Sequence, residues 1–233
     1  MDRANVEEQF AGLAGLADPV RRTLYRYVTE QGVAVARDEA ARAAGISRPL
    51  AAYHLDKLLA DGLLEVRYER RTGRRGPGAG RPAKLYVRSA RQVELSLPAR
   101  DYAVLAELLA RAVEADEAGA ARAALNAAAR DLGAAIGAET AGRTAPGDPL
   151  DRALAAVREV LASRGYEPYD DDGVIRLRNC PFDRIAAGHR QLVCQANLAM
   201  LRGLAERLGG AASVTPVLDP RPGCCCVALT SEN

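Results

Sequence analysis

The sequence lacks a run of eighteen apolar residues, the minimum for a membrane-spanning helix, and its first ten residues, MDRANVEEQF, contain no hydrophobic stretch. Neither a membrane span nor a secretory signal is therefore expected. Cysteine is absent from residues 1–179, and all five cysteines lie between Cys180 and Cys226. This odd number argues against a disulfide scaffold and favours a reducing, cytoplasmic location with metal or redox thiol chemistry.

Lysine is also scarce, since Lys57 and Lys84 are the only two, and arginine supplies the remaining positive charge. Residues 1–91 carry a net charge of +6 and residues 92–233 a net charge of −4. The excess is greatest in residues 67–91, where nine basic residues accompany one acid, Glu69. This asymmetry predicts a polyanionic partner for the first part of the chain only.

The length of 233 residues suits two modest domains, and 48% apolar and 27% charged residues are typical of a folded globular protein. Three helices are predicted near the start. The first spans 18–30 and begins at Asp18 and Pro19, and the second spans 38–44 and ends at Gly45. The third spans 48–60 after the capping residue Ser47. Two helices around a glycine turn predict a helix-turn-helix.

Two strands are predicted directly after the third helix, over residues 63–68 and 84–88, because apolar and polar residues alternate there. Between them lies the loop TGRRGPGAGRP, which has no apolar residue able to form a core. Two strands that flank a basic loop in this position are typical of a winged helix. The order of elements within the basic part of the chain predicts binding to double-stranded DNA.

In a winged helix, the helix after the turn enters the major groove. Arg48 is the expected guanine reader, since its guanidinium can donate two hydrogen bonds to that base, while Ala51 or Leu50 and Leu55 are expected to face the core. His54 and Lys57 are expected at phosphates, and the loop arginines at a narrow minor groove. The candidate DNA-binding residues are Ser47, Arg48, Pro49, Ala52, Tyr53, His54, Lys57, Arg74, Arg75 and Arg81.

The remaining sequence predicts helices over 98–116 and 117–141, a linker over 141–149, and then a mixed region. That region comprises a helix to about Gly165, a hairpin over 166–179, a helix over 189–208 and strands near 213–218 and 225–230. The predicted fold class is α+β, mostly helical. Its three expected parts are a winged-helix domain (1–92), a helical dimerisation segment (93–147) and a cysteine-containing α/β sensor domain (148–233).

The cysteines lie on separate predicted elements of the last part: Cys180 at a strand end, Cys194 in the first turns of a helix, and the run Cys224–Cys226 at the opening of the last strand. In a strand, Cys224 and Cys226 would face one way and Cys225 the other. Thiolates bind soft metals, and His189 could add a ligand, so a metal or redox site is predicted. The alternative is that the cysteines only pack in a core. A catalytic pair of Cys194 and His189 is not supported, because no oxyanion hole or orienting group is visible, and no enzyme activity is expected.

Several stretches resemble the SufR-like branch of the ArsR-type winged-helix regulators. They are SRPLAAYHLDKLLADGLLEV, GRPAKLYV, NCPFDRIAAGHRQLVCQANLAML and PGCCCVAL. The resemblance implies a homodimeric repressor of iron–sulfur cluster assembly genes that carries its own cluster, [4Fe–4S] or [2Fe–2S], in its C-terminal domain.

The resemblance also implies that Cys180, Cys194 and Cys225 hold the cluster, with Cys226 next to them. Cys224 and His189 are alternates for the remaining ligand position. Loss of the cluster is expected to weaken operator binding. The alternatives are a regulator of the same fold that senses zinc, the redox state of its thiols, or a small hydrophobic effector.

Overall fold

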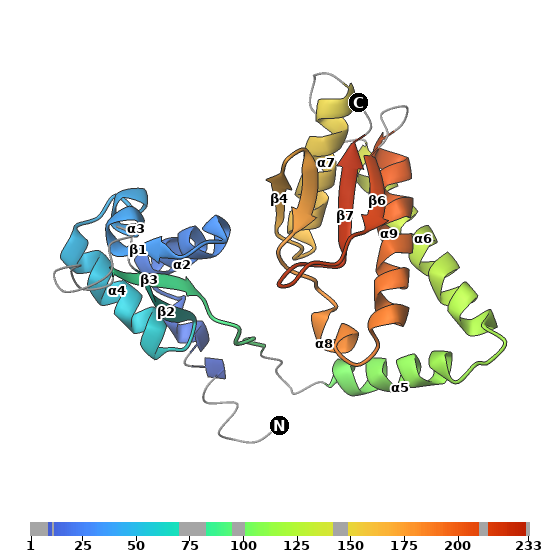
Figure 1. Ribbon diagram of the computed structural model, residues 1–233, viewed down its shortest axis with the longest axis horizontal. Helices are drawn as coiled ribbons and strands as arrows, with labels where there is room; N and C mark the ends of the chain where they lie inside the picture. The colour runs from blue at the N-terminus through green and yellow to red at the C-terminus, as the bar shows by residue number, and fades with distance from the viewer. Residues whose placement is uncertain are drawn as a thin grey trace. The chain divides into compact units, whose positions relative to one another are not determined.

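The computed structural model describes residues 9–10, 12–69, 83–94, 101–141, 149–209 and 214–231, and it divides the chain into two compact units, Met1–Arg100 and Asp101–Asn233 (Figure 1). Helix makes up 58% of the residues that the structure describes, and strands occur in both units. The prediction of a mixed, mainly helical fold is therefore confirmed. None of the helices in the described ranges has the length and hydropathy that a bilayer crossing needs.

Three helices of the first unit form where the sequence predicts them: α2 (Pro19–Gln31), α3 (Arg37–Ala43) and α4 (Arg48–Ala60). Asp18 caps α2, since its Oδ1 accepts a hydrogen bond from Arg21 N at 2.9 Å. Ser47 caps α4 by accepting from Leu50 N at 3.4 Å. Between α3 and α4 the chain turns at Gly45, whose φ of 64° is readily adopted by glycine.

The first unit also contains an antiparallel sheet of order β1-β3-β2, built from β1 (Val35–Ala36), β2 (Leu64–Glu69) and β3 (Ala83–Arg88). The predicted strands correspond to β2 and β3, which pair over their full lengths. Strand β1 was not predicted, because two residues are too few to show an alternating pattern. Most of the predicted wing loop, including Arg74, Arg75 and Arg81, lies outside the described residues.

Side chains from all three helices and the sheet form one core in this unit. Leu24 of α2, Leu55 and Leu58 of α4, and Tyr86 of β3 are almost completely buried. Burying a leucine of this kind contributes about 1.5–3 kcal/mol. The core therefore fixes which face of α4 remains at the surface.

The second unit places four strands and five helices together in its described parts (Figure 1). The strands β4 (Pro168–Asp171), β5 (Val174–Leu177), β6 (Val214–Leu218) and β7 (Val227–Ser231) form an antiparallel sheet of order β4-β5-β7-β6. The helices are α5 (Tyr102–Glu114), α6 (Ala120–Ala141), α7 (Pro149–Ser163), α8 (Asp183–Ala186) and α9 (Arg190–Gly209). The four-residue helix α8 was not predicted. The core includes Leu161, Tyr166, Leu177, Leu201 and Leu229.

Helices α5 and α6, which cover most of the segment expected at 93–147, belong to the second unit. Helix α6 packs along α9 at positions where both helices have glycine. A Cβ atom on Gly203 would collide with the carbonyl oxygen of Arg130, and one on Gly133 with that of Met200. The two backbones approach so closely that only glycine fits at these positions.

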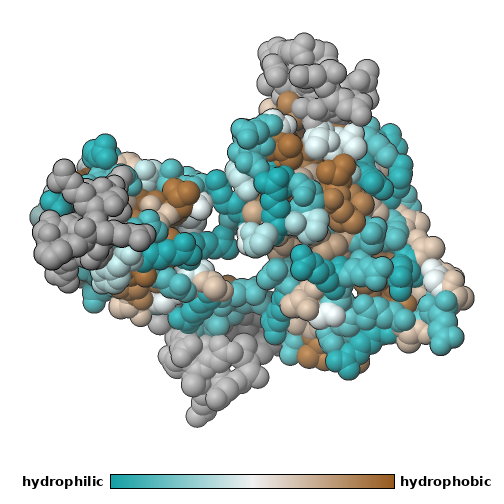
Figure 2. All heavy atoms as spheres, in the orientation of Figure 1, coloured by the Kyte–Doolittle hydropathy of each residue, from teal (hydrophilic) through white to brown (hydrophobic). Residues whose placement is uncertain are grey.

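Helix α5 presents an apolar face to the surface of this unit. Leu105, Leu108 and Leu109, which the sequence places on one helical stripe, are each more than half exposed, and Tyr102 is 72% exposed. Apolar residues at the molecular surface appear brown in Figure 2. An exposed apolar stripe of this kind is typical of a face that a partner covers.

The close packing of α6 on α9 predicts that Gly203→Ala lowers the free energy of unfolding by about 1–3 kcal/mol, because the added methyl group forces the backbones apart. Gly188→Ala is the control, since a Cβ atom there meets nothing within 4 Å. Urea unfolding followed by circular dichroism measures both variants. Equal stability of the two would contradict the packing described here.

Candidate DNA-contacting helix and cysteine cavity

Helix α4 has a buried face and an exposed face. Ala51, Leu55 and Leu58 are fully buried, as the sequence predicts for Ala51 and Leu55. Leu50 is instead 41% exposed. Most of the predicted DNA-contacting residues of this segment lie at the surface: Ser47, Arg48, Pro49, Tyr53 and Lys57 are exposed, and Ala52 is half-buried.

The predicted guanine reader, Arg48, forms an ion pair with Asp38 of α3, in which Arg48 Nε lies 2.7 Å from Asp38 Oδ1. Both side chains are more than half exposed, so the pair adds little to stability. Arg48 makes no other hydrogen bond or ion pair with a described residue. The pair engages Nε and leaves the two terminal amino groups of the guanidinium for a base.

Tyr53 and Lys57 lie one turn apart on the exposed face of α4. Tyr53 is 58% exposed, and Lys57 Nζ lies 6.0 Å from the centre of its ring. His54 is different, because it is only 8% exposed and its Nδ1 is buried without a hydrogen-bond partner among the described residues. The expectation that His54 contacts phosphate disagrees with this burial, which follows from its place on the core side of the helix.

Sequence reasoning missed a group that joins α4 to the wing strand β3. Asp56 Oδ1 accepts hydrogen bonds from Lys84 Nζ at 2.6 Å and from Tyr86 Oη at 3.1 Å. The Lys84 ammonium holds the pKa of Asp56 below its ordinary value. Lys84 and Tyr86 belong to the motif GRPAKLYV, so the signal was present in the sequence, but their partner on α4 was not recognisable.

Three helices with a glycine turn, an exposed face on the third helix and a following strand pair describe a known class of DNA-binding domain. Residues 16–67 match the family of helix-turn-helix domains. The match runs from three residues before α2 into β2 and so supports a DNA-binding transcriptional regulator. Neither a curated protein nor a solved structure matches the chain.

In the second unit, all five cysteines line a single cavity of about 640 Å³. They come from three places that are distant in sequence: Cys180 follows β5, Cys194 lies in α9, and the Cys224–Cys226 run precedes β7. The predicted convergence of these segments is therefore present in the structure. The run does not lie within the strand, so its cysteines do not follow a strand alternation, and each contacts a different partner.

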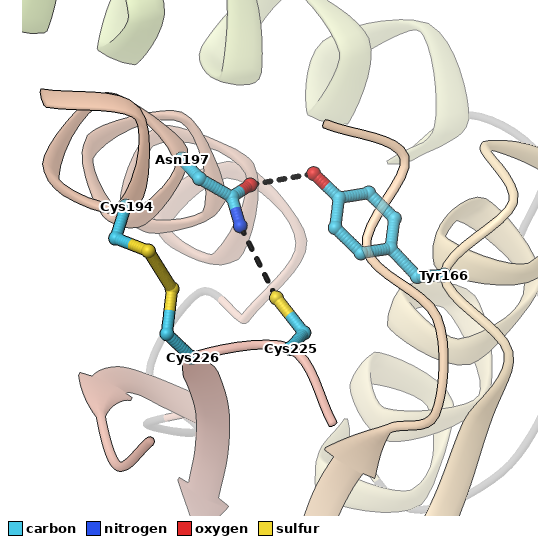
Figure 3. Close-up of a disulfide and its surroundings, with 5 residues drawn as sticks. All are labelled: Tyr166, Cys194, Asn197, Cys225 and Cys226. Carbon is cyan, nitrogen blue, oxygen red and sulfur yellow. Dashed lines mark hydrogen bonds between the residues drawn. A yellow bond between two sulfur atoms is a disulfide. The ribbon is translucent and has the colours of Figure 1, made fainter. Parts of the chain in front are cut away.

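Cys226 forms a disulfide with Cys194 (Figure 3). Their Cα atoms are 6.4 Å apart, within the range for disulfides. The cysteine count argued against a disulfide scaffold, and this single bond differs from that expectation. It joins α9 to the segment before β7, two parts of the chain that the sequence alone could not place together.

Cys225 is buried and its sulfur accepts several hydrogen bonds. The Cys180 thiol is the main donor, and it lowers the pKa of Cys225 to about 7, with further contributions from the backbone of Val227 and from Asn197. The same contact, together with burial, raises the pKa of Cys180. Of the two thiols, Cys225 is therefore the one that loses its proton first as the pH rises, while Cys180 keeps its proton.

Asn197 connects the sulfur of Cys225 to the core (Figure 3). Its Nδ2 donates to Cys225 Sγ at 3.4 Å, and its Oδ1 accepts from Tyr166 Oη at 2.6 Å. Burial raises the pKa of Tyr166, so its hydroxyl stays protonated and acts as the donor. This fixes the orientation of the amide, with its NH₂ group toward sulfur. No sequence signal marked either residue.

The remaining cysteine, Cys224, is half-buried and lies 3.5 Å from Tyr169 Oη. The contact with Cys224 raises the pKa of Tyr169. Cys224 therefore has a tyrosine partner on β4, whereas Cys225 and Cys226 contact other cysteines.

His189, the alternate metal ligand, does not line the cavity. Its Nδ1 lies 2.7 Å from Glu114 and its Nε2 lies 3.0 Å from Glu107, both on α5. Because a carboxylate occupies each ring nitrogen, the interpretation of His189 as a ligand is wrong for this structure. The histidine instead joins α5 to the start of α9.

The sequence predicts a metal site at the cysteines that line this cavity. Among the residues that the structure describes, no three side chains of His, Cys, Asp or Glu are arranged as a metal site. The disulfide occupies two of the sulfurs. Its reduction would leave five thiols at one cavity. Apart from Cys224, which contacts Tyr169, these are Cys180, Cys194, Cys225 and Cys226, and four is the ligand number of iron–sulfur and structural zinc sites.

The two carboxylates raise the pKa of His189, with Glu114 as the largest cause, above its ordinary value of 6.5. The stabilisation of the fold by the ion pairs of His189 is therefore complete below the pKa that this histidine has in the unfolded state. It is lost as the pH rises through the higher pKa of the folded state. His189→Gln should lower the free energy of unfolding more at pH 6 than at pH 9. The free energy of unfolding of Glu114→Gln should depend less on pH than that of the wild type. A pH-independent effect of His189→Gln would contradict this.

Proposed function

We propose that the protein is a homodimeric transcriptional repressor that binds operator DNA through α4. It would hold a thiolate-ligated iron–sulfur cluster at its cysteine cavity. The state of this cavity would control the affinity for the operator. The observation that carries the proposal is the convergence of all five cysteines on one cavity, in a different unit from the helix-turn-helix domain.

The exposed face of α4 supports a direct contact with DNA bases. Arg48 lies at the first residue of the helix and is oriented by Asp38. Residues near the N-terminus of this helix are the ones that reach base edges in helix-turn-helix proteins. Asp56 and Lys84 anchor β3 to the same helix, which fixes the base of the wing against the reading element.

The apolar face of α5 supports dimerisation. Leu105, Leu108 and Leu109 are exposed in the single chain, and a second copy would bury them. Helix-turn-helix proteins commonly bind two half-sites as symmetric dimers, so the operator is expected to be palindromic.

The cavity supports the cluster through the chemistry of its donors. Cys180, Cys194, Cys225 and Cys226 would be the ligands after reduction of the disulfide, and Cys225 already has hydrogen-bond donors that favour its thiolate. A bound cluster would supply a centre that responds to oxidants and to the supply of iron. Zinc is the alternative occupant, because it takes the same thiolates.

A connection from the cavity to α5 is visible in the second unit. Helix α9 carries Cys194, packs along α6 and is joined to α5 through His189. Order imposed on α9 by ligands at the cavity would therefore also act on α5, the proposed dimer helix. A coupling free energy of about 1–3 kcal/mol is enough for a useful switch.

A second candidate function is a thiol redox switch without metal, and the disulfide between Cys194 and Cys226 favours it. In this case oxidation and reduction of that bond would alter the same helix α9. The two candidates use the same cavity and differ in iron and sulfide content.

The DNA-binding proposal predicts that Arg48→Ala weakens operator binding by about 1–3 kcal/mol and relaxes specificity at one base pair. Lys57→Ala is the comparison. A lost phosphate contact weakens binding to all DNA sequences alike, and it reduces the slope of the logarithm of the binding constant against that of the salt concentration by about 1. Sites selected from a randomised DNA pool and fluorescence anisotropy measure both variants. An equal loss on all sequences for Arg48→Ala would show that it contacts phosphate.

The cluster proposal predicts that the protein purified and reconstituted without oxygen is coloured, with equal iron and acid-labile sulfide. Serine substitution of Cys180, Cys194, Cys225 or Cys226 should remove the visible absorption, while Cys224→Ser, whose partner is Tyr169, should retain it. Size-exclusion chromatography and circular dichroism test whether each variant stays folded and dimeric.

A colourless wild-type protein after strictly anaerobic reconstitution would overturn the cluster. About one zinc per chain would then support the zinc alternative. An absence of metal with a reversible Cys194–Cys226 bond in mass spectrometry would support the redox switch.

A further inference from the structure

The cysteine cavity also has a charged lining. Besides the five cysteines, three arginines line it, and Asp183 is the single acidic residue among the lining residues. Arg178 stacks on the ring of Tyr169 at 4.2 Å, and Arg221 pairs with Asp171 at 3.0 Å. The third arginine, Arg190, is exposed, and its side chain makes no hydrogen bond or ion pair with a described residue.

Arg190 lies one helical turn before Cys194 on α9, so the two side chains occupy the same side of the helix. The two residues of the disulfide differ in burial, since Cys194 is half-buried while Cys226 is only 8% exposed. The more exposed residue of the disulfide, Cys194, therefore lies beside an arginine that forms no ion pair with a described residue.

From this juxtaposition we infer that the cavity is a binding and exchange site for a small anionic thiol, which reduces the Cys194–Cys226 disulfide. The anionic group of the thiol would lie near Arg190 while its sulfur reaches Cys194. The inference rests on the proposed function in one respect only: the exchange releases the thiols that would hold the cluster.

The reaction balances in two exchange steps. The external thiolate attacks Cys194 Sγ, the bond to Cys226 breaks, and Cys226 leaves as a thiolate that takes up a proton. A second molecule of the thiol then attacks the external sulfur of the mixed disulfide. Cys194 is released as a thiol, and two small thiols become one small disulfide, so the two electrons that reduce the protein come from them.

Three two-carbon thiols of different charge test the inference on the oxidised full-length protein: 2-mercaptoethanesulfonate (anionic), 2-mercaptoethanol (neutral) and cysteamine (cationic). Each reduction rate is divided by the rate of the same thiol with a small uncharged disulfide, because thiols differ in nucleophilicity. The anionic thiol should react about tenfold faster than the neutral one, and added salt should reduce this preference. Equal normalised rates would overturn the inference.

The variant Arg190→Gln should lose most of the preference for the anionic thiol. Arg202→Gln is the matched control, because Arg202 is exposed on the same helix but does not line the cavity. Mass spectrometry after a short reaction should find the mixed disulfide on Cys194 rather than Cys226. A mixed disulfide on Cys226, or an equal effect of both arginine variants, would contradict the assignment.

The failure of this inference and the failure of the cluster can be told apart. Reduction with an uncharged phosphine bypasses the anionic thiol, and reconstitution then reports on the cluster alone. A protein that binds a cluster after phosphine treatment but shows no charge preference would retain the proposed function and exclude the anionic thiol.

Discussion

The cysteine cavity depends on how the segment before β7 is held against β5. Cys225 N donates to the carbonyl oxygen of Leu177 at 2.9 Å, and Asp219 N donates to that of Cys226 at 2.9 Å. Arg176, which is only 4% exposed, donates to Asp171 at 2.7 Å and to Asp219 at 2.5 Å. Because the guanidinium is buried while both carboxylates reach the surface, Arg176 links the segment to β4 from inside the fold, and the segment keeps a fixed path.

That fixed path explains why three consecutive cysteines have three different roles. Each sulfur leaves the backbone in a different direction and meets Tyr169, Cys180 or Cys194. Adjacent cysteines therefore differ in their chemistry: Cys225 has hydrogen-bond donors that favour a thiolate, whereas Cys226 is in a disulfide. The same segment brings Arg221 to the cavity and so contributes charge as well as sulfur.

Local signals were sufficient to predict helices α2, α3 and α4 and strands β2 and β3 of the first unit. Asp18 and Ser47 cap the helices as expected, and Gly45 makes the turn, because caps and turns depend on residues close in sequence. The pairing of Arg48 with Asp38 and the burial of His54 could not be read from the sequence, since both depend on how α3 and the core pack against α4.

In the second unit the sequence predicted that the cysteines lie close together, but it did not predict which side chains they contact. The contacts of Asn197 with Cys225 and of His189 with Glu107 and Glu114 join residues far apart in the chain. No local pattern encodes such pairs. His189 in particular was a candidate ligand in the sequence, and only the position of α5 shows that carboxylates occupy both of its nitrogens.

The central claim is that the state of the cysteine cavity sets the affinity of the helix-turn-helix domain for DNA. The most direct test is an anaerobic titration of a selected operator with protein reconstituted with the proposed cluster and with the same preparation after the cluster has been removed. The account predicts that Kd rises about 5- to 150-fold on removal, and that Cys180→Ser shows the weaker value throughout. The same Kd in both states would contradict the claim.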